Sequence, residues 1–144
     1  MIRNYNATDW AACVKLFCKV FNDEPWYDEW TTESASRYLN DIMETPGFIG
    51  FIGLSNYEVD GFMFGHSKQW WNGKEFFVHE MCVKREAQGT GMGSAIMSYA
   101  KAQLKSSGIQ TISLITGKGV PAEQFYMKNG FEEVKHLRMY VAKL

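Results

Sequence analysis

A short apolar stretch, a glycine-rich turn and an amphipathic stretch follow one another at residues 76–104, and this succession limits the folds that the chain can adopt. Residues 76–83 are rich in aromatic and β-branched side chains, which favours a strand. Residues 94–104 place Ile96 and Ala100 at helical spacing among good helix formers. A glycine-rich turn leaves the first N–H groups of such a helix free, and these groups attract an anion. The sequence therefore predicts an anion-binding turn between a strand and a helix.

The order of the glycines indicates which anion this turn is built for. The segment at residues 88–93 reads Gln-Gly-Thr-Gly-Met-Gly. A dinucleotide fingerprint would need glycine where Ser94 stands, and the Gly-Lys-Ser/Thr run of a P-loop is absent. Taken alone, such a segment is also typical of a flexible surface turn that binds nothing.

A second motif downstream decides between these interpretations. Residues 121–131 read Pro-Ala-Glu-Gln-Phe-Tyr-Met-Lys-Asn-Gly-Phe, in which Pro121 suits the first helical turn and Gly130 the C-terminal cap. In order and spacing, the two motifs together resemble the GNAT superfamily of acyl-CoA-dependent N-acetyltransferases, over nearly the whole chain. The resemblance implies an α/β (α+β) fold with a mixed, mostly antiparallel central sheet of about six or seven strands. About four helices would flank this sheet, which would splay between strands 4 and 5.

The rest of the chain fits this architecture as one domain over residues 1–144. Hydrophobic periodicity and turn residues predict each element. The expected strands are 2–5, 48–54, 59–71, 75–83 and 111–116, with a closing pair at 131–134 and 138–142. The expected helices begin at Thr8 or Asp9, at Thr31 or Thr32, near Ser94 and at Pro121.

The resemblance also implies how the acyl donor binds. In this family the glycine loop holds the pyrophosphate of acetyl-CoA, and the strand before it pairs with the pantetheine arm. The residues that the resemblance assigns to acetyl-CoA are Met81, Cys82, Val83, Gln88, Gly89, Thr90, Gly91, Met92, Gly93, Ser94, Phe125 and Lys128. No metal is expected, since the His, Cys, Asp and Glu residues show no metal-ligand spacing.

Forming an amide from a thioester needs a base for the amine and a proton donor for the departing thiolate. Tyr126 matches the helix-four tyrosine of the family, so the resemblance assigns it to the thiolate. His79 and Glu80 are the candidate bases, because some members carry His or Glu at these positions while others use a water chain. An imidazole titrates near neutrality, which suits a base, and the alternative role of Glu80 is to bind an ammonium group. On a regular strand these two neighbours point to opposite faces.

Residues 22–30 combine several acids with three aromatic side chains around a proline. Carboxylates attract ammonium groups and aromatic faces hold cations, so this segment predicts a site for a cationic amine. Its candidate acceptor-binding residues are Asp23, Glu24, Trp26, Tyr27 and Trp30. The alternative is an ordinary solvated connection. In GNAT enzymes the segment between the first two helices commonly lines the acceptor site, which favours the first interpretation.

The sequence therefore predicts an enzyme that moves an acetyl group from acetyl-CoA to a small cationic amine, aminoglycoside-like or polyamine-like. A protein N-terminal or lysine acetyltransferase and a non-catalytic CoA-binding sensor are the alternatives. A net charge of −1 gives no general attraction to nucleic acid, and no apolar run is long enough to span a membrane.

Cysteine usage and family habit suggest the setting of the protein. The three cysteines are odd in number and are expected to be reduced, as in a cytoplasmic protein. Family habit implies a homodimer. Trp70 and Trp71, at the tip of an expected hairpin, are one candidate contact, because one of them must face outward.

Overall fold

Five strands form one mixed sheet in the computed structural model, which describes residues 1–144. The strands lie side by side in chain order, and only the last pair is parallel. They are β1 (Ile2–Asn4), β2 (Phe48–Ser55), β3 (Glu58–Trp70), β4 (Gly73–Val83) and β5 (Ile109–Ser113). The mixed, mostly antiparallel architecture that the sequence predicts is thus confirmed.

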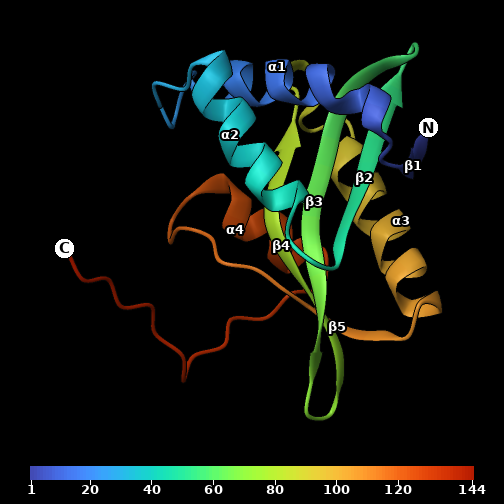
Figure 1. Ribbon diagram of the computed structural model, residues 1–144, viewed down its shortest axis with the longest axis vertical. Coiled ribbons are helices and arrows are strands. Elements are labelled where there is room, and N and C mark those ends of the chain that lie inside the picture. Colours follow the sequence, from blue (N-terminus) through green and yellow to red (C-terminus); the bar gives the residue numbers. More distant parts are fainter.

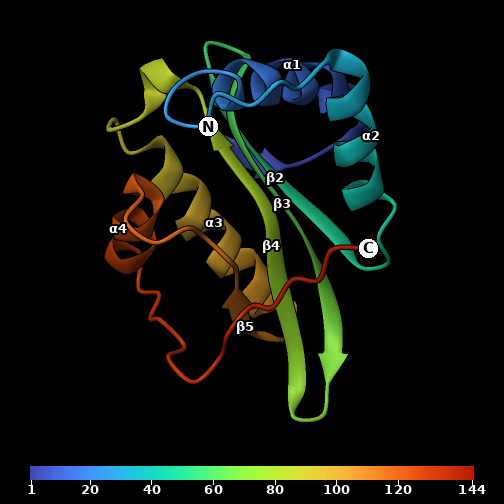
Figure 2. The same cartoon turned by 90° about the vertical axis from the view of Figure 1, so that its left-hand side faces the viewer.

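Helices cover both faces of this sheet, as the two perpendicular views show (Figures 1 and 2). α1 (Trp10–Phe21) and α2 (Thr32–Met43) lie on one face. α3 (Met92–Ser106) and α4 (Pro121–Lys128) lie on the other. The short 3-10 turns η1 (Ala7–Asp9) and η2 (Arg85–Ala87) precede α1 and α3. Crossing a membrane would need a longer and more apolar helix than any of the four.

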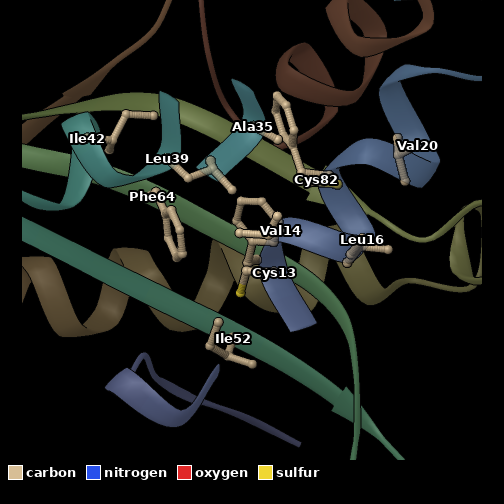
Figure 3. Packing of buried hydrophobic residues seen from close by; sticks show 12 residues of the cluster. Cys13, Val14, Leu16, Val20, Ala35, Leu39, Ile42, Ile52, Phe64 and Cys82 are labelled. Atoms are coloured by element: carbon tan, nitrogen blue, oxygen red, sulfur yellow. The ribbon is translucent and has the colours of Figure 1, made fainter. Parts of the chain in front are cut away.

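Strand alternation divides the apolar side chains between two cores. On β3, Phe62 and Phe64 pack under α1 and α2 with Leu39, and all three are fully buried. Met63, between them, packs on the opposite face with Ile96 of α3. Figure 3 shows the first cluster, in which Leu39 of α2 and Phe64 approach each other across the interface. The two cores hold the sheet rigidly between its helices and so fix the position of β4.

β4 separates from β5 along half of its length, and the expected splay is confirmed. Residues 74–77 of β4 pair with β5, whereas residues 78–83 have no strand on that side. A bulge accompanies the separation, since Phe64 pairs with Glu80 but Gly65 pairs with Val78. His79 is the extra residue and has no partner on β3, so the alternation of side chains shifts at this point.

The closing pair of strands is not formed, and this expectation is wrong for the single chain. Residues 132–144 run away from the body as an irregular segment with a turn at residues 135–136 (Figure 1). Their only backbone hydrogen bond among themselves joins Leu137 N–H to the Val134 carbonyl, at 3.2 Å. A strand exists only where another strand accepts its hydrogen bonds, and none does so here. The sheet accordingly has five strands, the last of which ends at Ser113 instead of the expected Thr116.

Candidate active site

A cavity of about 780 Å³ opens where β4 and β5 separate. Its walls come from the unpaired part of β4, the start of α3, the segment after β5 and one side of α4. The site residues expected from the sequence that line it are Trp26, His79, Glu80, Met81, Cys82, Val83, Gln88, Gly89, Gly91, Gly93, Ser94, Phe125, Tyr126 and Lys128. Thr90 and Met92 are not among them, because the Thr90 hydroxyl donates to the Ala87 carbonyl at 2.5 Å and Met92 packs against the α3 core.

The glycine loop forms a concave anion site at the start of α3. Gly89 and Gly91 have φ angles of +75° and +94°, a conformation that a side chain strongly disfavours. A Cβ on either would meet no atom within 4 Å and would project into open space. No side chain caps α3, and its first backbone bond runs from Ala95 N–H to the Gly91 carbonyl at 2.9 Å. The N–H groups of residues 92–94 are therefore free, and the loop fits a pyrophosphate.

The unpaired edge of β4 continues from this loop along the cavity. Met81 and Val83 turn their side chains to the α3 core, and the Cys82 side chain is buried in the opposite core. This stretch can therefore offer the cavity backbone groups but not the Cys82 thiol. The Val83 carbonyl already accepts a hydrogen bond from Gln88 Nε2 at 3.0 Å. An extended amide chain would thus find free main-chain partners chiefly on the residues before Val83.

Glu80 is held on the α2 side of the cavity by Tyr38, a residue that is not among the site residues expected from the sequence. The Tyr38 hydroxyl donates to Glu80 Oε2 at 2.6 Å. The Tyr38 ring stacks on Trp30, with centroids 5.2 Å apart, so the donor is fixed in place. Burial raises the pKa of Glu80 to about 7, which the Tyr38 hydrogen bond opposes. A tyrosine on the buried face of a predicted helix was a usable signal, because its hydroxyl needs a partner.

His79 is engaged with a second histidine. Its Nε2 lies 2.6 Å from Nδ1 of His66, and the two rings stack with centroids 4.7 Å apart. The ring of Phe77 also contacts it, on the face opposite the buried Phe76. His79 and Glu80 therefore share one side of the sheet, because the bulge breaks the strand alternation, and the expected opposite orientation is wrong. Burial and the neighbouring imidazole lower the pKa of His79, so its ring is neutral near pH 7.

Tyr126 presents an unpaired hydroxyl to the cavity. The side chain is half-buried and its hydroxyl makes no hydrogen bond within the protein; since every buried side-chain polar atom has a partner, this hydroxyl is open to the cavity. Edge-to-face contacts with Phe125 and Phe131 fix the ring. Burial, together with the negative charge of Glu80, raises the pKa of Tyr126 to about 12. The phenol therefore stays protonated at neutral pH and is available as a donor.

Of the acidic segment, residues 22–30, only Trp26 lines the cavity. Asp23 and Glu24 both bind the guanidinium of Arg85, the former at 2.6 Å between Oδ2 and Nη1. With Tyr27 they line a separate, smaller hollow of about 440 Å³. Trp26 lines both spaces.

Two residues of this segment support the Tyr38–Glu80 contact from the side. Trp30 packs on Tyr38, and its Nε1 donates to Asp28 Oδ2 at 3.0 Å. The charge of Asp28 also adds to the raised pKa of Glu80, which places the two acids in electrostatic contact. No spacing of residues in the sequence indicates the effect of Asp28 on Glu80 or the ion pairs of Arg85 with Asp23 and Glu24.

Comparisons with known proteins agree with this fold. The model of the acetyltransferase (GNAT) domain matches residues 42–133. No curated protein sequence is similar to the chain. Among solved structures, a protein described as a possible acetyltransferase from Clostridium difficile 630 is similar, with a TM-score of 0.83 at 15% identity. The match covers 100% of this chain and 97% of that one.

Two further structures share the fold. The aminoglycoside N-acetyltransferase AAC(6')-Iy in complex with CoA has a TM-score of 0.77 at 15% identity, covering 100% of this chain and 95% of that chain. A transcriptional regulator from Bacillus halodurans C-125 has a TM-score of 0.77 at 19% identity, covering 99% of each chain. At these identities the similarity concerns the fold.

Proposed function

The chain belongs to the GNAT acetyltransferase family, and from this premise we propose that it transfers the acetyl group of acetyl-CoA to a small cationic primary amine. The acyltransferase class follows from the family, and the acceptor class is our inference. The observation that carries it is the pairing of two groups in one cavity: the carboxylate of Glu80 and the free phenol of Tyr126. Solved structures of aminoglycoside acetyltransferases share the fold, which supports a small amine acceptor.

The residues that would hold acetyl-CoA are those of the glycine loop and the β4 edge. The free N–H groups of residues 92–94 would bind the pyrophosphate, and the main chain around Met81 would pair with the pantetheine arm. When bound, acetyl-CoA supplies a thioester that is already activated toward amines. The protein then has to position two substrates and move two protons.

Glu80 is the base that the geometry supports best. Its Oε2 receives the Tyr38 hydrogen bond, which leaves Oε1 to accept a proton from the amine. With a pKa of about 7 it is largely ionised above neutrality, yet basic enough to take that proton. His79 is less suited, because its Nε2 is occupied by His66. As the amine nitrogen bonds to the carbonyl carbon, Glu80 takes the proton that this nitrogen loses.

Tyr126 completes the proton balance. When the carbon–sulfur bond breaks, its hydroxyl donates a proton to the departing sulfur and recovers one from solvent. The hydroxyl lines the cavity and, with a pKa of about 12, stays protonated at neutral pH, so a proton is available for the sulfur. The net reaction forms one amide bond, breaks one thioester and moves one proton from nitrogen to sulfur.

Negative charge on the acceptor side favours a cationic substrate. Glu80 and Trp26 line the cavity, and Asp28, which does not line it, lies close enough for its charge to affect Glu80. An ammonium group would be attracted by both carboxylates and by the aromatic face. Asp23 and Glu24 contribute less, since both already bind Arg85, whose single positive charge offsets one of their two negative charges.

A screen of amines with acetyl-CoA, read by release of free thiol, tests the proposed function. We expect turnover with small polycationic amines, including aminoglycosides and polyamines, and not with neutral amines of similar size. Peptides with a free N-terminus or a lysine form a second arm of the screen. Turnover confined to peptides would replace the acceptor class, and thiol release no faster than hydrolysis with every amine would favour a non-catalytic CoA-binding protein.

Acetyl-CoA binding should raise the melting temperature of the wild type. A ligand at 100 times its Kd stabilises the folded state by about 2.7 kcal/mol, which corresponds to a shift of about 5–10 °C for a chain of this size. Gly91→Val should abolish the shift, because the side chain enters the anion site. Gly108→Val is the matched control, since Gly108 has a similar φ of +81° and open surroundings at the far end of α3. Equal shifts in both variants would show that the glycine loop does not bind the pyrophosphate of acetyl-CoA.

Removing the charge of Asp28 should affect acceptor binding more than removing the charges of Asp23 and Glu24. Asp28→Asn is expected to raise the acceptor KM several-fold and to leave acetyl-CoA affinity unchanged, and added salt should reduce the difference, since exposed charges are screened. The double variant Asp23→Asn/Glu24→Gln should leave the acceptor KM nearly unchanged, because Arg85 already occupies these carboxylates. The reverse result would return the acceptor site to Asp23 and Glu24. Steady-state kinetics at two ionic strengths provide the measurement.

A further inference from the structure

The wall of the cavity on the α1 side is apolar. The end of α1 and the segment after it contribute Val20, Phe21 and Trp26 to the lining. The rings of Phe21 and Trp26 meet edge to face, with centroids 5.0 Å apart. Trp26 keeps 40% of its surface exposed, so that its indole is open to a ligand. A flat aromatic surface of this kind packs better against an apolar ring than against a hydrated polar chain.

The segment that carries Trp26 is folded back on the end of α1. The Asp28 N–H donates to the Phe21 carbonyl at 2.9 Å. The side chain of Asn22 binds both backbone groups of Trp30, accepting from its N–H at 2.7 Å and donating to its carbonyl at 2.8 Å. Trp26 therefore lies in a closed loop whose conformation is set before a ligand binds, and little freedom is lost when a ring packs on it.

Aromatic contacts connect this wall to Glu80. The ring of Phe17 lies 4.8 Å from that of Phe21 and 5.6 Å from that of Tyr38, measured between centroids. The Tyr38 hydroxyl in turn donates to Glu80. Phe17 is buried in the core under α1 and α2, so these rings are held in place. The apolar wall and the carboxylate are thus fixed relative to each other.

The cavity contains few charges. Among the residues that line it, Glu80 alone is acidic and Lys128 alone is basic, apart from the neutral imidazole already described. Asp28 does not line the cavity, and Asp23 and Glu24 line the smaller hollow instead. A second ammonium group on the acceptor would lose water against the apolar wall without gaining a carboxylate, which is unfavourable.

We propose that the preferred acceptor is a primary amine with a single ammonium group and an apolar ring. The ring would pack on Trp26 and Phe21 while the ammonium group meets Glu80. A site with a large apolar surface and one polar group that sets the orientation is typical of small-molecule pockets. This inference rests on the proposed function and narrows it: polyamines and linear amines would react, but at lower kcat/KM.

Matched amines test the inference. Phenylethylamine and butylamine each carry one ammonium group and differ by the ring, whereas spermidine carries several ammonium groups and no ring. We expect kcat/KM of the wild type to be at least about tenfold higher for phenylethylamine than for either of the others, since even one methylene in an apolar site contributes about tenfold.

Replacing Trp26 should remove most of this preference. Trp26→Ala is expected to lower kcat/KM for phenylethylamine about tenfold and to leave that for butylamine nearly unchanged. Trp26→Phe keeps a ring and should retain part of the preference. Trp71→Ala is the matched control, because Trp71 is 86% exposed at the β3–β4 hairpin and does not line the cavity.

Binding without turnover separates this inference from the proposed function. With CoA in place of acetyl-CoA no acetyl group is available, and phenylethylamine should raise the melting temperature of the CoA complex more than butylamine does, in the wild type but not in Trp26→Ala. If no amine turns over, the proposed function fails. A ring-specific shift that is lost in Trp26→Ala would then still support the inference, and equal shifts would contradict it.

Three kinetic results would overturn the inference and leave acetyl transfer to amines in place. They are equal kcat/KM for phenylethylamine and butylamine, a preference for spermidine over both, and a preference for the ring that Trp26→Ala does not reduce.

Discussion

Replacing Tyr126 by phenylalanine is expected to lower kcat by about 10²–10⁴-fold, the usual contribution of a positioned proton donor. The acceptor KM and the acetyl-CoA shift should change little, because the interaction strengthens only as charge develops on sulfur. The substitution removes one hydroxyl that has no partner in the protein, so the fold should be as stable as the wild type. Single-turnover kinetics separate the chemical step from product release.

Acyl donors with more acidic thiols should partly rescue Tyr126→Phe, since a better leaving group needs less help. Tyr99→Phe is the matched control. Tyr99 is a half-buried tyrosine on α3 that packs against Phe51 and does not line the cavity. A wild-type kcat in Tyr126→Phe, where chemistry limits turnover, would leave Tyr126 a packing residue.

The second large effect is expected from Glu80→Gln. The variant keeps an oxygen to accept the Tyr38 hydrogen bond but loses the base, so kcat/KM at pH 8 should fall by about 10²–10⁴-fold. In the wild type, kcat/KM should decrease as the pH falls through about 7, because Glu80 becomes protonated there. This acid limb should be missing from the residual activity of the variant.

The Glu80→Gln variant, although less active, should be more stable than the wild type. The pKa of Glu80 is about 7 in the folded protein and 4.5 in an unperturbed side chain. Between these values the folded state binds more protons than the unfolded state, so the contribution of Glu80 to stability is lost as the pH rises. The amide introduced by Glu80→Gln does not ionise, and the variant should therefore gain stability relative to the wild type between pH 5 and pH 8. Denaturant unfolding at both pH values measures this difference.

Two controls distinguish a base from a charge elsewhere on the strand. Glu75→Gln changes a carboxylate on β4 that lies outside the cavity, and it should leave kcat/KM and its pH profile unchanged. His79→Ala should have a smaller effect than Glu80→Gln, because His79 is bonded to His66. Loss of the acid limb in His79→Ala, with the limb kept in Glu80→Gln, would make His79 the base.

Local features of the chain determined much of the fold and the anion loop. The requirement for glycine at Gly89 and Gly91 comes from left-handed backbone angles, which only a few residue types tolerate. The strand pattern of residues 76–83 and the helical spacing after it are also local, so these elements could be predicted without knowing their neighbours. The motif that contains Tyr126 is a single helix, and its position beside the loop followed from the resemblance.

Tertiary structure decided the properties that depend on residues distant in the sequence. The near-neutral pKa of Glu80 arises from burial, and the hydrogen bond that orients it comes from Tyr38, 42 positions away. Arg85 neutralises Asp23 from 62 positions away, which no spacing in the sequence indicates. The bulge at His79 depends on how β4 pairs with β3, and it alone places His79 and Glu80 on one side of the sheet.

The C-terminal tail, residues 132–144, shows the same division most clearly. The sequence by itself determined that residues 138–142 favour a strand, because β-propensity is a property of the side chains. Whether a strand forms depends on a free edge within reach, and only the tertiary structure decided that the single chain leaves its tail and its β5 edge unpaired. The physical reason is that backbone hydrogen bonds in a sheet are made between segments, so no segment can specify its own partner.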